Sequence, residues 1–212
     1  MKNDSYIGKV ILLNGSPHKR GTTYTALRAV ADALEAEGVE AEIVHAGAEG
    51  HVGCSACGGC RKLGRCVHAD VNPIAEKLAV ADGVVLGSPV YYASPNGNFL
   101  GLLDRLFYSS SRDSKYMKVG ASVACARRGG CTATFDVLNK YFTISNMPIV
   151  SSSYWNQVHG AGAEDALSDE EGMQTMRTLG KNMAFLIKAI KLARDQIGTP
   201  ELEKKIYTNF IK

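Results

Sequence analysis

Apolar and polar positions along the chain alternate between two periods, and this pattern predicts strands followed by helices. Residues 9–14 (KVILLN) and 83–88 (GVVLGS) are continuous apolar runs, typical of strands buried on both faces. Residues 39–43 alternate apolar and acidic positions, which predicts a strand near a sheet edge. Residues 119–126 and 148–151 give a fourth and a fifth strand.

Helical spacing of apolar residues fills the segments between these strands. Helices are predicted from Thr22 to Gly38, around 73–78, from about Asn96, around 135–142 and over 176–193. The candidate helix caps are Thr22 or Thr23, Asp70, and a capping box of Ser168 with Glu171. Strands alternating with helices predict an α/β fold, a doubly wound five-stranded parallel sheet with helices on both faces.

Length and charge narrow the class of protein. The 212 residues with 45% hydrophobic content predict a single domain over 1–212, with an aperiodic cysteine-rich insertion at 53–66 and a tail at 198–212 that packs against a neighbouring subunit. A net charge of +3 is too small for a nucleic-acid surface. The polar start and the absence of a long apolar run predict a cytoplasmic protein without a membrane segment.

The loop after the first strand is the first candidate site, because ligands of such sheets bind beyond the carboxyl ends of the strands. It lies just before a helix, where free N–H groups and the helix dipole favour a phosphate. An ordinary solvated turn is the alternative. The loop matches neither GxGxxG nor GxxxxGK[ST]. Its candidate phosphate-binding residues are Ser16, His18, Arg20, Thr22 and Thr23.

Two further loops lie at the same predicted edge. The loop after the third strand offers aromatic rings and backbone amides for a planar heterocycle, and its candidates are Pro89, Val90, Tyr91, Tyr92, Ser94, Asn96 and Gly97. The loop after the fourth strand offers guanidiniums for an anionic ring or a second phosphate, and its candidates are Arg127, Arg128, Gly129 and Gly130. A plain connection and solvated arginines are the respective alternatives.

The remaining candidate chemistry lies in the cysteines. Cys54, Cys57, Cys60 and Cys66 form CxxCxxCx5C, whose first two spacings equal those of cluster-binding ferredoxin runs. A zinc site and free thiols are the alternatives. Cys125 and Cys131 are expected to be small apolar residues. The histidines at 45, 51, 68 and 159 are expected in loops or on the surface. Trp155 is expected in a subunit interface, and the lining of the ligand pocket is the alternative.

Four motifs in this order together resemble the NADPH-dependent FMN reductase family of flavodoxin-like proteins, and most of all its iron-sulfur flavoproteins. They are LLNGSPHKRGTTYTAL, CSACGGCRKLGRC, VVLGSPVYYASPNGNFLGLLDRL and ARRGG. The resemblance implies FMN phosphate in the 16–23 loop, the isoalloxazine ring against 89–97, a [4Fe-4S] cluster on the four cysteines, and a homodimer or homotetramer. The chain departs from the family pattern at His18, Arg20 and Thr22, where Arg, Asn and Asn are frequent.

The expected function is that of an FMN-dependent NAD(P)H oxidoreductase that passes electrons to a small acceptor, namely a quinone, a nitro or azo compound, or free flavin. Because the flavin carries the chemistry, no catalytic side chain is predicted. A cluster would add a protein partner such as a ferredoxin. The alternatives are a non-enzymatic electron carrier of the flavodoxin or iron-sulfur flavoprotein type and a zinc-stabilised redox-sensing domain.

Overall fold

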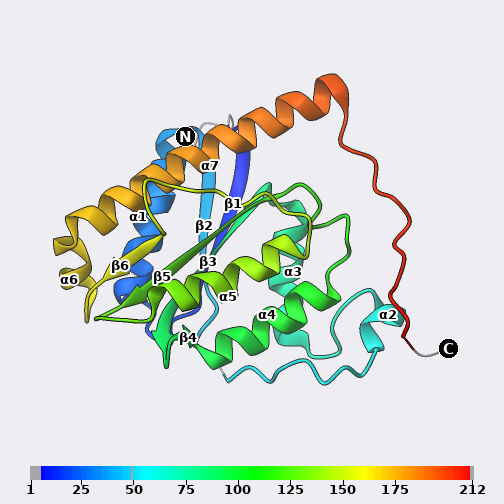
Figure 1. The fold of residues 1–212 in the computed structure, drawn as a ribbon, viewed down its shortest axis with the longest axis horizontal. Coiled ribbons are helices and arrows are strands. Elements are labelled where there is room, and N and C mark those ends of the chain that lie inside the picture. Colours follow the sequence, from blue (N-terminus) through cyan, green and yellow to red (C-terminus); the bar gives the residue numbers. More distant parts are fainter. Residues whose placement is uncertain (1–5, 49, 211–212) are drawn as a thin grey trace.

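A parallel sheet forms the centre of the protein (Figure 1), whose computed structural model describes residues 6–48 and 50–210. The strands are β1 (Gly8–Asn14), β2 (Val39–His45), β3 (Gly83–Tyr91), β5 (Val119–Ala126) and β6 (Gln157–His159), with a two-residue strand β4 (Ser94–Pro95) antiparallel to β3. The parallel strands lie in the order β2-β1-β3-β5-β6. Counted without β4, this is the flavodoxin-like order, and it confirms the predicted fold class.

Helices cover both faces of the sheet (Figure 1). They are α1 (Thr22–Ala36), α2 (Gly59–Leu63), the 3-10 turn η1 (Ala69–Val71), α3 (Asn72–Val80), α4 (Gly97–Ser109), α5 (Cys131–Thr143), α6 (Ala163–Ser168) and α7 (Glu170–Ile197). Val10 and Leu12 of β1 belong to the core under α1 and α7, whereas Ile11 and Leu13 belong to the core under α3, α4 and α5. Both faces of β1 are therefore buried, which explains its continuous apolar run.

The fifth parallel strand lies later in the chain than predicted. Residues 148–151 form only one isolated bridge, between Ile149 and Gly120. Pro148 has no N–H to extend this pairing, and the chain bends away before β6 pairs with the end of β5. The prediction of a strand over 148–151 is therefore wrong, although the number of parallel strands is right.

The predicted cap of α1 is also wrong. Its N-cap is Gly21, which has no side chain to bond the first turn. The Thr22 hydroxyl instead donates towards the carbonyl oxygens of Gly160 and Gly162, at 3.2 and 3.1 Å, and Thr23 is buried. The first turn of α1 therefore keeps free backbone N–H groups, while Thr22 ties the helix to the segment after β6.

Two further predicted caps are wrong, because Asp169 takes the place of Ser168 at one helix and Asp70 forms an ion pair in place of a cap. Asp169 caps α7, since its Oδ1 accepts from the backbone N–H of Gly172 at 3.0 Å. The Ser168 hydroxyl donates back to a carbonyl oxygen within α6, so no capping box with Glu171 forms. Asp70 caps no helix and takes part in an ion pair described below.

The cysteine-rich segment and the tail approach each other at one end of the molecule. The segment contains α2, so the prediction that it has no regular structure is wrong over residues 59–63. After α7 the tail runs extended back past the sheet to α2 (Figure 1). Cys54 and residues 203–207 line a common groove.

Candidate functional site

The buried side chain of Asn14 fixes the shape of the first loop. Its Oδ1 accepts from the Ser16 N–H at 3.1 Å, and its Nδ2 donates to the carbonyl oxygens of His18 and Lys19 at 3.5 and 3.3 Å. Ser16 Oγ accepts from the His18 N–H at 3.1 Å. The loop thus curls around one amide group, and the His18 and Arg20 side chains stay exposed.

This loop has the features of an anion site. It leads into the N-terminus of the 15-residue helix α1, which has no side-chain cap. Free N–H groups at such a terminus bind phosphates readily. The exposed Lys19 and Arg20 add positive charge beside it. The hydroxyl proton of Thr22 is already used in its hydrogen bonds to the backbone, so Thr22 could only accept a hydrogen bond at this site.

Backbone from the loop after β2 packs directly on the first loop. A Cβ added to Gly47 would lie 2.4 Å from the carbonyl oxygen of Gly15. His45 Nε2 lies 2.9 Å from the carbonyl oxygen of Ser16 and donates to it. Only a residue without a side chain at position 47 allows this contact, so Gly47 helps to hold the first loop in place.

The second loop is a hairpin that extends β3 beyond the sheet edge. Residues 90–91 pair with residues 94–95. Tyr92 and Ala93, at the turn, have φ values of 52° and 57°. Two consecutive positive φ angles are typical of a type I′ turn. The Tyr92 ring is fully exposed at the tip, and the hairpin therefore presents an aromatic side chain at the sheet edge.

Asn96 connects the second loop to the first. Its Nδ2 donates to the Gly15 carbonyl oxygen at 3.0 Å, and its Oδ1 accepts from the Asn98 N–H at 3.0 Å, so it is also the N-cap of α4. The predicted start of this helix is confirmed. The backbone N–H of Asn96 donates to Ser88 Oγ. Because β1 and β3 are neighbours, Asn96 lies at the switch point of the sheet, where α/β proteins bind ligands.

The third loop packs against the hairpin. Gly130 has a φ of 96°, and a Cβ there would lie 2.8 Å from Val90 Cγ1 and 3.0 Å from Ala93 Cα. Arg127 and Arg128 are exposed beside this contact. The structure therefore brings all three predicted loops to one edge of the sheet, with cations on either side of the aromatic hairpin.

The four cysteines of the insertion surround a second site. Cys54, Cys57, Cys60 and Cys66 are free thiols and line one pocket together with Arg105 of α4. Among the described residues, no three His, Cys, Asp or Glu side chains are arranged to hold a single metal ion. Four cysteine thiols around a shared pocket are a donor set that both a zinc ion and an iron-sulfur cluster use, so the two alternatives both remain predictions.

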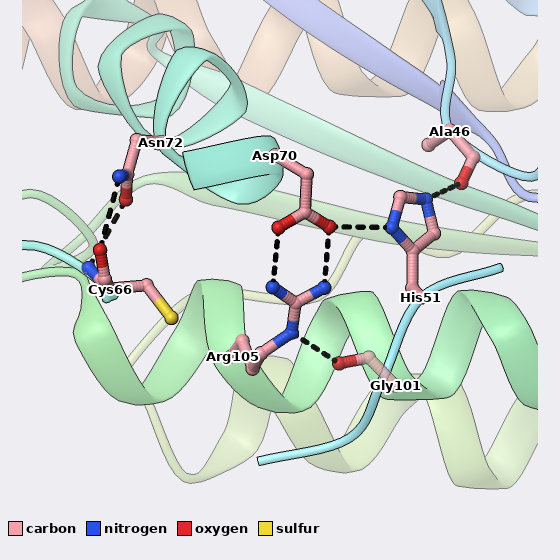
Figure 2. A network of polar contacts seen from close by, with 7 residues as sticks. All are labelled: Ala46, His51, Cys66, Asp70, Asn72, Gly101 and Arg105. Carbon is pink, nitrogen blue, oxygen red and sulfur yellow. Dashed lines mark hydrogen bonds and ion pairs between the residues drawn. The ribbon is translucent and has the colours of Figure 1, made fainter. Parts of the chain in front are cut away.

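A polar network lies behind this pocket (Figure 2). Arg105 Nη1 and Nη2 donate to the two oxygens of Asp70, both at 2.6 Å. His51 Nδ1 lies 2.8 Å from Asp70 Oδ2, and its Nε2 lies 3.0 Å from the Ala46 carbonyl oxygen. Each ring nitrogen thus lies within hydrogen-bond distance of an oxygen atom, and these two contacts hold the imidazole ring in one orientation. The Arg105 guanidinium, followed by His51, holds the pKa of Asp70 well below its usual range.

Sequence reasoning missed this network. His51 lies in a loop, as predicted, but its side chain is only 7% exposed, which the prediction did not foresee. The sequence contains one indication of this network, which is an arginine on the apolar face of a predicted helix. Arg105 lies among Leu102 and Leu106 and is 2% exposed. A lone buried charge at such a position requires a counter-charge within reach. The sequence alone did not show that Asp70 supplies it.

Cys125 and Cys131 lie in the core, as expected of small apolar residues. Burial raises the pKa of Cys125 to about 12 and that of Cys131 to about 11, so both remain protonated thiols. Trp155 is half-exposed and packs on Tyr154 with a ring-centroid distance of 5.0 Å. Its place in a subunit interface remains a prediction.

The sheet order and the three loops at its switch point define a flavodoxin-like protein. A flavodoxin from the domain Archaea superimposes with a TM-score of 0.59 at 15% identity, over 85% of this chain and 99% of that one. Residues 8–162 match the NADPH-dependent FMN reductase family. The chain belongs to this family.

Its relatives include iron-sulfur flavoproteins from two archaea. One from Methanocaldococcus jannaschii is 32% identical over 191 residues, which cover 86% of this chain and 99% of the relative. One from Archaeoglobus fulgidus is 36% identical over 200 residues, which cover 88% of this chain and 99% of the relative. Within the described part of the chain, no helix has the length and apolar character needed to cross a membrane.

Proposed function

We propose that the protein binds FMN at the three loops and acts as an NAD(P)H oxidoreductase that passes electrons to a small acceptor. The observation that carries this proposal is the hydrogen bond from Asn96 to Gly15, which joins an uncapped helix N-terminus to an aromatic hairpin at the switch point. One loop suits the phosphate and the other suits a planar ring. FMN, when bound, supplies the chemistry of accepting a hydride and releasing electrons.

The chain's own residues would bind and orient the cofactor. The first turn of α1 and the exposed cations Lys19 and Arg20 would hold the phosphate, and the hairpin would lie against the ring. Arg127 and Arg128 would place positive charge near a reduced, anionic ring. Cys54, Cys57, Cys60 and Cys66 would hold a [4Fe-4S] cluster, which supplies one-electron chemistry towards a partner such as a ferredoxin.

The test is the visible absorbance of anaerobically purified protein before and after addition of NADH or NADPH. We expect flavin bands that bleach with one of the two nucleotides, and a broad underlying absorbance from the cluster, checked by iron and acid-labile sulfide analysis. Protein that remains colourless after incubation with FMN would contradict the flavin assignment.

Steady-state kinetics separate the reductase from the electron carrier. A reductase should oxidise NAD(P)H repeatedly when a quinone, a nitro or azo compound, or free flavin is supplied. A carrier should stop after the bound flavin is reduced. Flavin that is reduced only by a reduced protein donor such as a ferredoxin, and never by a nicotinamide, would favour the carrier.

A further inference from the structure

Arg105 lies between the cysteine pocket and the carboxylate of Asp70. Its side chain lines the pocket with the four cysteines, although the residue is only 2% exposed. Both terminal nitrogens are bonded to Asp70, and Nε lies 3.4 Å from the carbonyl oxygen of Gly101 (Figure 2). A guanidinium bonded through both arms of its fork has one fixed orientation. Its charge is therefore held in one place beside the pocket.

The ion pair is polarised towards the cysteines. Arg105 lines the pocket together with the four cysteines and Asp70 does not, so the positive member of the pair is the one that borders the pocket. Both oxygens of the Asp70 carboxylate accept from the terminal nitrogens of Arg105 at 2.6 Å, and an arginine side chain does not lose its proton in proteins. The guanidinium is thus charged at every working pH.

The position of Cys66 relative to this charge is also fixed. The Cys66 N–H donates to Asn72 Oδ1, and Asn72 Nδ2 donates to the Cys66 carbonyl oxygen, both at 3.1 Å (Figure 2). This two-way clamp holds the cysteine backbone at the start of the segment that leads into α3. Arg105 and Cys66 are therefore both held by hydrogen bonds independent of any bound group.

We propose that Arg105 sets the reduction potential of the iron-sulfur cluster on the four cysteines, with Asp70 as its counter-charge. This inference rests on the proposed function. The reduced form of a cluster carries one more negative charge than the oxidised form, and a fixed positive charge nearby favours it. Reduction potentials of clusters respond to net charge, hydrogen bonds to sulfur and solvent exposure. The low exposure of Arg105 limits screening of its charge by water and salt.

Anaerobic redox titration of the holoprotein, followed by visible absorbance and by electron paramagnetic resonance of the reduced cluster, tests this proposal. At the midpoint potential of the wild type, we expect Arg105→Gln to lower the ratio of reduced to oxidised cluster at least tenfold. For a one-electron couple this corresponds to a midpoint about 59 mV lower. Asp70→Asn should raise the same ratio, because the guanidinium then loses its counter-charge. A general disturbance of the pocket would not be expected to shift the midpoint potential in opposite directions in the two variants.

Two control variants make the result specific. Arg65→Gln also removes one positive charge, from an exposed side chain that precedes Cys66 in the chain. Because solvent screens an exposed charge, the ratio of reduced to oxidised cluster should change less than threefold. Arg105→Lys keeps the charge and should remain closer to the wild type than Arg105→Gln does. Should Arg105→Gln not fold, Asp70→Asn decides alone, with an upward shift supporting the proposal and its absence overturning it.

The outcomes also separate this inference from the proposed function. A wild type that contains iron and sulfide, but whose Arg105→Gln and Asp70→Asn variants both stay within threefold of its ratio or shift in the same direction, overturns the role of Arg105. A wild type with neither iron nor sulfide overturns the cluster assignment itself, and with it the inference.

Discussion

Gly47 lies where the backbones of two loops are in contact, and its replacement tests the proposed phosphate site. A Cβ in Gly47→Ala would meet the Gly15 carbonyl oxygen at 2.4 Å, so the first loop has to move. We expect the Kd for FMN to rise at least about tenfold, equivalent to about 1.4 kcal/mol. Fluorescence titration of flavin-free protein measures this. Gly50→Ala is the matched control, because its Cβ would enter open space. Equal affinities of the two variants would contradict the prediction.

Asp70 should stabilise the protein at neutral pH and lose this effect in acid. Because Arg105 and His51 lower the pKa of the folded-state carboxyl, its contribution is present above the unfolded value of about 3.9 and is lost as the pH falls below it. We expect Asp70→Asn to lower the free energy of unfolding by about 2 kcal/mol at pH 7, somewhat less than a fully buried pair would cost, since the Asp70 side chain is 32% exposed.

Urea unfolding of flavin-free protein at about pH 7 and about pH 3 measures this difference, which should shrink at the lower pH. Asp32→Asn is the control. Asp32 pairs with Arg28 on the surface of α1 and is 65% exposed, so its removal should cost less than about 0.5 kcal/mol. A constant difference between wild type and Asp70→Asn across this pH range would contradict the assigned role of the Asp70 carboxylate.

At the scale of secondary-structure elements, Asn96 has two roles that substitutions can separate. Asn96→Ala loses both the cap of α4 and the hydrogen bond to Gly15, and should lower the free energy of unfolding by about 2 kcal/mol. Asn96→Asp keeps the capping oxygen but loses the amide donor, so it should cost less stability and still weaken FMN binding. Thermal unfolding and FMN titration of both variants check this. Unchanged FMN affinity in Asn96→Asp would show that the bond to Gly15 does not hold the site together.

The elements that the sequence predicts well are those whose side chains are sorted by burial. β1, β3 and β5 are apolar on both faces, and the long helices present one apolar face, so periodicity finds them. The strand at 148–151 fails because burial alone does not ensure pairing, and Pro148 lacks the N–H that a longer ladder requires. Caps fail because short polar side chains have several partners within reach, as Thr22 and Asp169 show.

For the candidate site too, the position of the loops could be predicted but their hydrogen bonds could not. The three loops can be predicted from sequence because strand ends of a parallel sheet share one edge. The hydrogen bonds that fix them depend on residues far apart in the chain, such as Asn96 and Gly15, and no local pattern shows such a pair. The ion pair between Asp70 of η1 and Arg105 of α4 likewise joins two residues that are far apart in the chain. Fold topology could therefore be predicted, whereas the partners of individual polar groups could not.

At the scale of the whole molecule, the tail has apolar side chains that this chain does not bury. Ile206 and Phe210 are 92% and 94% exposed, and Tyr207 is also exposed. The Tyr116 hydroxyl donates to the carbonyl oxygen of Pro200 at the beginning of this segment. We propose that a second copy of the chain covers these side chains, because exposed apolar groups in one segment favour an interface.

Removal of residues 199–212 should reduce the size of the oligomer and change the unfolding free energy of the separated chain by less than about 0.5 kcal/mol. Sedimentation velocity measures the first effect, and urea unfolding at low protein concentration measures the second. Phe210→Ser in the full-length protein is a milder variant that should weaken association in the same direction. An unchanged sedimentation coefficient in both variants would exclude the tail from the interface.

Helix α4 begins at the switch point and carries Arg105 beside the cysteines, so one rigid element joins the two proposed sites. Gly97 and Arg105 are separated by about 12 Å along the helix axis, from a rise of about 1.5 Å per residue. An electron that moves between the sites would tunnel through packed protein. The length of this helix fixes the distance over which it would tunnel. We therefore expect the internal transfer rate to be independent of solvent viscosity, in contrast to proteins in which a hinged domain carries the electron. Flash photolysis in buffers of increasing glycerol content would measure it, and a rate that falls with viscosity would reveal a moving part.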